Sequence, residues 1–145
     1  MPTQSLLTLS TGQSQVTTQG SESCVIPLGP DQIAQAVFRQ SPPYASQLET
    51  AINMVEDAIV ASGLRKMPRG TLVAKAGPLY EALSPTHMPA QLSLAQVERR
   101  YQDIAMPAQR LPTAPILEID PLALAALIFV RELMHHLGYS DLALE

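Results

Sequence analysis

The sequence predicts a small α+β protein, with N-terminal antiparallel strands followed by helices, one or two further strands and a long apolar C-terminal helix. At 145 residues the chain has the usual length of one domain, so we expect residues 1–145 to form a single domain. Short runs of apolar and β-branched residues come before residue 28, whereas later apolar residues recur at three- and four-residue spacing. Strands that precede the helices favour an α+β domain over a regular βαβ fold.

Three strands are predicted near the N-terminus, over residues 5–9, 15–18 and 22–28. The stretch Thr11-Gly12-Gln13 between the first two is typical of a hairpin loop. Pro27 has no backbone N–H to donate, so the third strand ends there or lies at an edge of the sheet.

Two helices follow these strands. Gly29-Pro30-Asp31 is typical of a helix start, and Ser41-Pro42-Pro43 ends that segment. The second helix begins near Ser46, which forms a capping box with Glu49, and stops at Gly63.

The middle of the chain alternates between extended and helical patterns. Residues 70–75 predict a strand, and residues 77–89 predict a loop with a short helical turn at 79–83. Another helix starts at Ser93, which forms a capping box with Gln96, and is over by Met106-Pro107. Residues 116–119 are a candidate short strand.

The last predicted helix begins at Asp120-Pro121 and stops at Gly138. Every residue from Leu122 to Val130 is apolar, so this part of the helix has no polar face and must be covered on all sides. A domain of this size seldom wraps a helix completely. We therefore expect the chain to form a homo-oligomer, such as a dimer, or to bind a protein partner.

Composition disfavours several classes of protein. Charged residues make up only 15% of the chain and its net charge is −4, which disfavours binding to nucleic acid or to an anionic membrane surface. No apolar run reaches the roughly 18 residues of a membrane span, and the N-terminus lacks the basic region of a signal peptide. We expect a cytoplasmic protein. Its one cysteine, Cys24, excludes an internal disulfide and a cysteine zinc cluster.

Histidines near the C-terminus are weak candidates for a metal site. Glu132 and His135 have the E-x-x-H spacing that places both side chains on one face of a helix, and His136 and His87 complete the candidate set. Histidines in the last turn of a helix also interact favourably with its dipole and its free carbonyl groups. Because that interpretation needs no coincidence of loop geometry, we expect no metal and no cofactor.

Positive charge is concentrated in one loop. Arg65, Lys66 and Arg69 lie between a predicted helix and a predicted strand, bounded by proline and glycine. Cations on such a loop can bind a phosphate or a carboxylate, or can be solvated and complement the end of the helix before them.

The sequence has no Walker loop and no G-x-G-x-x-G, G-x-S-x-G, H-E-x-x-H or C-x-x-C motif, an absence that does not exclude an enzyme. The sparse charge and the apolar helix favour a non-catalytic interaction or accessory protein that acts through an oligomeric or partner surface. The alternative is a small-molecule binding protein or enzyme that holds an anionic ligand in a pocket near residues 65–69.

Overall fold

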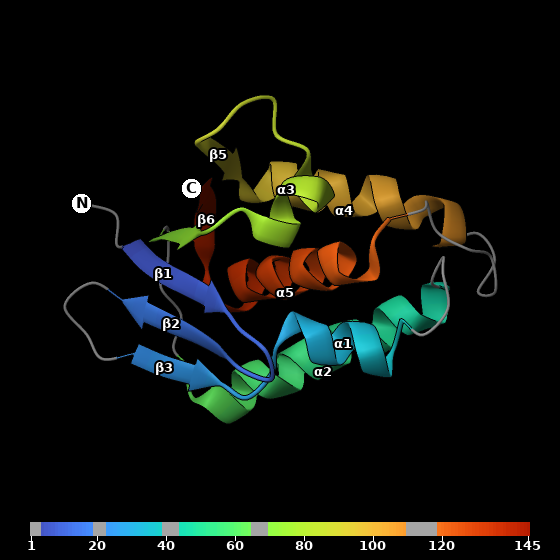
Figure 1. Ribbon diagram of the computed structural model, residues 1–145, viewed down its shortest axis with the longest axis horizontal. Coiled ribbons are helices and arrows are strands. Elements are labelled where there is room, and N and C mark those ends of the chain that lie inside the picture. Colours follow the sequence, from blue (N-terminus) through green and yellow to red (C-terminus); the bar gives the residue numbers. More distant parts are fainter. Residues whose placement is uncertain (1–3, 19–22, 39–43, 65–69, 110–118) are drawn as a thin grey trace.

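The computed structural model describes residues 4–18, 23–38, 44–64, 70–109 and 119–145. Six of its segments form one sheet, in the order β3-β2-β1-β4-β6-β5 (Figure 1). The strands are β1 (Gln4–Leu9), β2 (Ser14–Thr18), β3 (Ser23–Ile26), β4 (Gly70–Ala74), β5 (Ala90–Ser93) and β6 (Tyr139–Leu144). The helices are α1 (Pro30–Ala36), α2 (Ala45–Ser62), α3 (Gly77–Leu83), α4 (Leu94–Gln109) and α5 (Pro121–Leu137).

The sheet is mixed. The predicted antiparallel strands are confirmed, because β1 pairs with β2 and β2 pairs with β3 in that manner. At the centre, however, β1 runs parallel to β4 and β4 runs parallel to β6, so the helices between them form crossover connections. The α+β class is correct, but the expectation of one or two further strands is not. Within the described part of the chain, three strands follow β3, and two of them, β5 and β6, lie where no strand was predicted.

Alternation along the first three strands gives the sheet one buried face. Leu7, Val16 and Ile26 point into the core, while Leu6 and Val25 on the other face are 47% and 44% exposed. Helix α2 packs against β3, and α4 packs against β5 and β6. The period of two therefore identifies which residues of β1 to β3 face the helices.

Helix α5 lies at the centre of the helical layer. It contacts α1, α2, α3 and α4, which flank it on both sides in Figure 1. Every side chain from Ala123 to Val130 is fully buried. The prediction that this helix is covered on all sides is confirmed, but the chain itself provides the cover. Self-association remains a prediction, and it no longer has this helix as its support.

The chain does not end with its apolar helix. Gly138, in the left-handed conformation at φ 81°, stops α5, and the next six residues form β6. The predicted apolar helix is therefore confirmed, but it is not the last element. Strand β6 could not be predicted because it pairs with β4 and β5, which lie far from it in the sequence. None of the described helices is long and apolar enough to cross a membrane.

Helix boundaries follow local signals in part. The capping box of Ser93 and Gln96 is present, with both side chains bonded to the partner's backbone N–H, at 3.2 and 2.8 Å. Helix α2 instead begins after Tyr44, whose N–H donates to Gln47 Oε1 at 2.7 Å, so the box predicted at Ser46 and Glu49 is not used. Helix α4 continues to Gln109, beyond its predicted end. The predicted strand at 116–119 falls almost wholly outside the described residues.

Substitution of buried Leu127 by alanine tests the structural role of α5. Leu127→Ala removes a fully buried side chain and is expected to lower the free energy of unfolding by about 2–5 kcal/mol. Leu122→Ala is the matched control on the same helix, because Leu122 is 38% exposed, and should cost less than about 1 kcal/mol. Urea unfolding measures both. Equal losses in the two variants would contradict the described packing of α5.

Candidate functional site

A hollow of 220 Å³ lies beyond the carboxyl ends of the central strands. We call it the carboxyl-edge hollow, and its lining residues are Leu9, Ser10, Thr11, Pro30, Asp31, Pro78 and Leu122. These residues come from the end of β1, the β1–β2 turn and the first turns of α1, α3 and α5. In open sheets with parallel strands, ligands bind outside the carboxyl ends of the strands, where the strand order reverses. Here the order reverses between β1 and β4.

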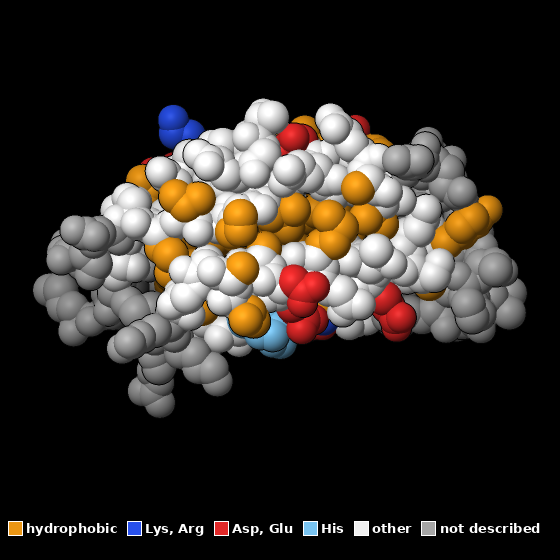
Figure 2. Space-filling view, turned by 90° about the horizontal axis from the view of Figure 1, so that it is seen from below, with side chains coloured by type: hydrophobic (Ala, Val, Ile, Leu, Met, Phe, Trp, Pro, Cys, Tyr) orange, Lys and Arg blue, Asp and Glu red, His pale blue; other side chains and the backbone are white. Residues whose placement is uncertain are grey.

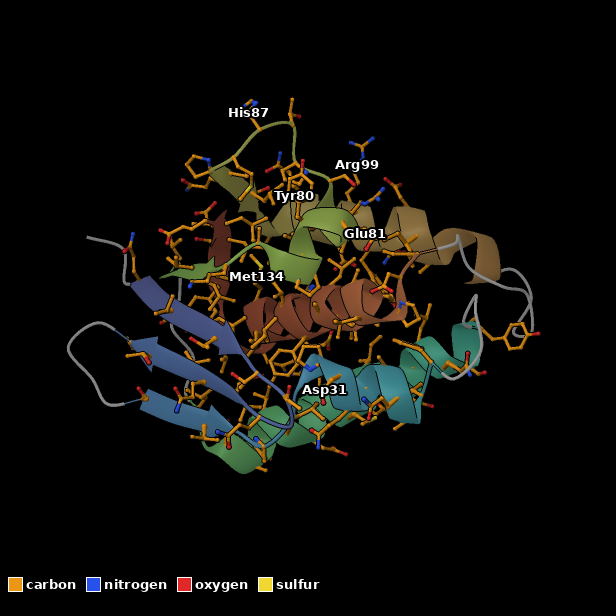
Figure 3. All side chains as sticks on the ribbon, viewed as in Figure 1. Asp31, Tyr80, Glu81, His87, Arg99 and Met134 are labelled. Carbon is orange, nitrogen blue, oxygen red and sulfur yellow. The ribbon has the colours of Figure 1, made fainter. Side chains whose placement is uncertain are left out.

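The β1–β2 turn at this hollow is held in place by α1. Gly12 has φ 77° and donates its N–H to Asp31 Oδ1 at 3.1 Å. A Cβ atom added to Gly29 would collide with Ser10 O and with Gly12 N, so only glycine allows α1 to start this close to the turn. Figure 3 shows Asp31 at this junction. The predicted hairpin loop and helix start thus form one joined structure.

The polar side chains of the hollow are hydroxyl groups and one carboxylate. Ser10 and Thr11 are exposed, and Asp31 is half-buried. Of the described residues that line the hollow, Asp31 is the only charged one. Hydroxyl groups can donate hydrogen bonds to phosphate oxygens, and a carboxylate can bind a hydrated divalent cation.

A second polar site, which we call the Arg131 cluster, occupies the far half of α5. Arg131 Nε and Nη2 donate to the two carboxylate oxygens of Glu98 at 2.6 and 3.0 Å, and Nη1 donates to Glu132 at 2.7 Å. The guanidinium also lies 4.2 Å from the centre of the Tyr101 ring, within cation–π range. All three nitrogens of Arg131 are engaged within the chain, so this side chain stabilises the packing of α4 on α5.

The two glutamates of the Arg131 cluster have opposite pKa shifts. Hydrogen bonding from Arg131 is the main reason that the pKa of Glu98 falls from 4.5 to about 2. Burial raises the pKa of Glu132, and Arg131 opposes this shift only in part. Glu132 is 4% exposed. A buried carboxylate is costly unless it is paired, and Arg131 supplies that pair.

The four histidine and glutamate residues predicted as weak metal ligands do not come together as one set. His136 Nε2 lies 3.5 Å from Glu132 Oε1 and 3.6 Å from Glu56 Oε2 on α2. His135 turns to Glu98 instead, with its Nε2 atom 3.2 Å from Glu98 Oε2. Figure 3 shows His87 in the loop between α3 and β5, where it points outward and away from α5.

Several residues of these sites were not found from the sequence. The sequence singles out none of Glu56, Glu98 and Arg131 as a site residue. Glu98 and Arg131 are separated by 33 positions, so no local spacing connects them. Thr11 and Asp31 are predicted only as turn and helix-start residues, because their proximity depends on the fold. The E-x-x-H spacing did direct attention to Glu132.

The basic loop of Arg65, Lys66 and Arg69 lies outside the described residues, so its role in anion binding stays a prediction. The chain enters β4 at Gly70, the amino end of that strand. The carboxyl-edge hollow lies at the opposite end of β4.

Comparison with known proteins gives matches in structure alone. No protein-family model and no curated protein matches the sequence. The Aquifex aeolicus Ppx/GppA phosphatase, type II variant, is similar at a TM-score of 0.70 and 14% identity, over 99% of this chain and 53% of that protein. A Cytophaga hutchinsonii exopolyphosphatase is similar at a TM-score of 0.68 and 9% identity, over 99% of this chain and 53% of that protein. An exopolyphosphatase-like protein is similar at a TM-score of 0.65 and 13% identity, over 98% of this chain and 55% of that protein.

The chain therefore has the fold of about half of a Ppx/GppA-type protein. This finding contradicts the prediction of a non-catalytic interaction or accessory protein, because the similar structures are those of enzymes. That prediction rested on sparse charge and on an apolar helix thought to need a partner. The helix is covered within the chain, and the similar structures agree better with the alternative, a small-molecule binding protein or enzyme. The pocket that this alternative places near residues 65–69 lies outside the described residues.

Removing the negative charge of Glu98 is expected to change how the free energy of unfolding depends on pH. Folding lowers the pKa of Glu98 from 4.5 to about 2. The stability that ionised Glu98 contributes is therefore fully present above pH 4.5 and is lost as the pH falls from 4.5 toward 2. Glu98→Gln should therefore reduce the loss of stability in acid. Asp103→Asn, at an exposed position on the same helix, is the charge-matched control and should leave the acid profile unchanged.

Urea unfolding midpoints between about pH 3 and pH 5 measure this effect. A profile for Glu98→Gln as steep as that of the unmodified chain would contradict the assigned Glu98–Arg131 interaction.

Proposed function

We propose that the chain binds a phosphate-bearing small molecule in the carboxyl-edge hollow and forms the ligand-binding half of a phosphatase-like enzyme. The observation that carries the proposal is the fold match over nearly the whole chain to a phosphatase and an exopolyphosphatase. Because one fold hosts many functions, the fold match does not locate the ligand site. The location proposed for that site rests on the hollow itself. The hollow lies at the sheet edge where ligands of such folds bind.

The charge of the hollow bears on the form of the ligand. A bare polyphosphate would meet the Asp31 carboxylate, the one charge among the described lining residues. Mg²⁺ binds one or two protein carboxylates together with substrate phosphates, and so would turn this repulsion into attraction. We therefore propose that the ligand is bound as its magnesium complex. The hydroxyl groups of Ser10 and Thr11 would hold the outer phosphate oxygens.

Adding a negative charge at the hollow tests its position. Thr11→Glu places a carboxylate at an exposed lining residue, and binding of magnesium tripolyphosphate should weaken about tenfold or more, or about 1.4 kcal/mol. Gln15→Glu makes the same charge change on β2, at an exposed residue outside the hollow, and should leave the affinity within about twofold. Isothermal titration calorimetry of the full chain measures both.

Two results would contradict the proposal. One is the absence of tripolyphosphate binding by the unmodified chain. The other is binding that is unaffected by Thr11→Glu but is lost when Arg65 and Arg69 are replaced with alanine, which would place the anion at the basic loop.

Replacing Asp31 with asparagine tests the role of magnesium. Asparagine keeps an oxygen that can accept the Gly12 N–H but removes the negative charge. Asp31→Asn should abolish the gain in tripolyphosphate affinity that Mg²⁺ gives the unmodified chain. The same titrations with and without Mg²⁺ measure that gain. A magnesium effect of equal size in the variant would show that Asp31 does not contact the cation.

A further inference from the structure

We propose that Glu56, Glu132 and His136 form a binding site for a Zn²⁺-type transition-metal ion, separate from the carboxyl-edge hollow. One ligand atom from each of these residues lies within 4.8 Å of the other two. The ligands come from two packed helices, Glu56 from α2 and the other two from α5. The chemistry of the set, one imidazole and two carboxylates, suits zinc.

The spacing of the ligand atoms supports a tetrahedral site. His136 Nε2 lies 3.5 Å from Glu132 Oε1 and 3.6 Å from Glu56 Oε2, longer than the usual N–H···O distance of about 2.9 Å. Nitrogen and oxygen ligands bind zinc at about 2.0–2.2 Å, so two ligands of a tetrahedral ion are about 3.4 Å apart. Both measured distances match that separation. The Glu56 and Glu132 ligand atoms lie within 4.8 Å of each other, so side-chain rotation can bring all three atoms around one ion.

Glu132 is held in a fixed position for this role. Its Oε2 atom accepts from Arg131 Nη1 at 2.7 Å, which leaves Oε1 directed toward His136. An outer partner that orients a ligating carboxylate is the usual arrangement around metal sites. Glu98 and Glu132 both pair with Arg131, and Glu56 lies beside Glu132, so three carboxylates but one guanidinium are gathered at this site. The local excess of negative charge favours a dication.

A fourth position remains open beside these three ligands. A hollow of 530 Å³ is lined by Glu56, Glu132 and His136 together with Ile52, Arg131 and His135. Figure 2 shows histidine and acidic side chains adjoining on the face that is seen from below. Three protein ligands with an open position leave room for water or for a small molecule on the ion, as in zinc sites that exchange ligands.

The neighbouring histidine provides a matched control. His135 and His136 are adjacent on α5, and their side chains are similarly exposed, at 46% and 41%. Only His136 faces the pair of Glu56 and Glu132, whereas His135 contacts Glu98. A dependence of binding on His136 but not on His135 therefore separates a built site from surface histidines that attract metal in general.

Zinc titration of the metal-stripped, untagged full chain tests the proposal. Calorimetry should detect one Zn²⁺ per chain in the unmodified protein. His136→Ala and Glu56→Gln should each weaken binding about 100-fold or more, while His135→Ala should stay within about twofold. His136→Ala and Glu56→Gln both keep the buried Glu132–Arg131 pair, and circular dichroism checks that each of these two variants folds. If one of them fails to fold, the other carries the test alone.

Other outcomes overturn the proposal. They are no zinc binding by the unmodified chain, equal losses for the two histidine variants, or binding that is unchanged in both His136→Ala and Glu56→Gln. The result is independent of the tripolyphosphate titrations. Fourteen positions of α5 separate His136 from Leu122 at the carboxyl-edge hollow, which is about 21 Å along the helix. Failure of one site therefore leaves the other unaffected.

Discussion

Burial of α5 from Ala123 to Val130 is the constraint on which the rest of the structure depends. These residues carry no polar side chain, so they can leave water only if neighbouring elements cover every side of this part of the helix. The other four helices and the sheet supply that cover. The need to cover α5 places these elements around its axis, and their ends in turn position the loops that join them.

The two polar sites lie at the two ends of this buried helix. At its start, the first turns of α1, α3 and α5 meet the β1–β2 turn and leave the carboxyl-edge hollow between them. Toward its end, Arg131 and Glu132 are the first charged residues of the helix, and they are paired as they must be when buried. Function is therefore proposed where the apolar core ends and where polar groups are held by a rigid frame.

Local patterns in the sequence predict much of the fold. The runs of apolar and β-branched residues before residue 28, the helix start at Asp120-Pro121 and the helix stop at Gly138 predicted correct elements, since each signal depends on residues that are close in sequence. The parallel pairing of β1 with β4 and of β4 with β6 could not be predicted in this way, because it joins segments that lie far apart. The run from Leu122 to Val130 indicated burial correctly but could not distinguish cover by the chain itself from cover by a partner. The Glu98–Arg131 pair and the carboxyl-edge hollow arise from tertiary contacts alone.

The most direct test of the central claim is to map the binding of magnesium tripolyphosphate by two-dimensional nuclear magnetic resonance of the ¹⁵N-labelled chain. We predict that the amide signals of Ser10, Thr11 and Gly12 move first and saturate together with that of Asp31, because these residues form the hollow. Movement confined to Arg65, Lys66 and Arg69, or no movement at all, would contradict a ligand site at the carboxyl edge of the sheet.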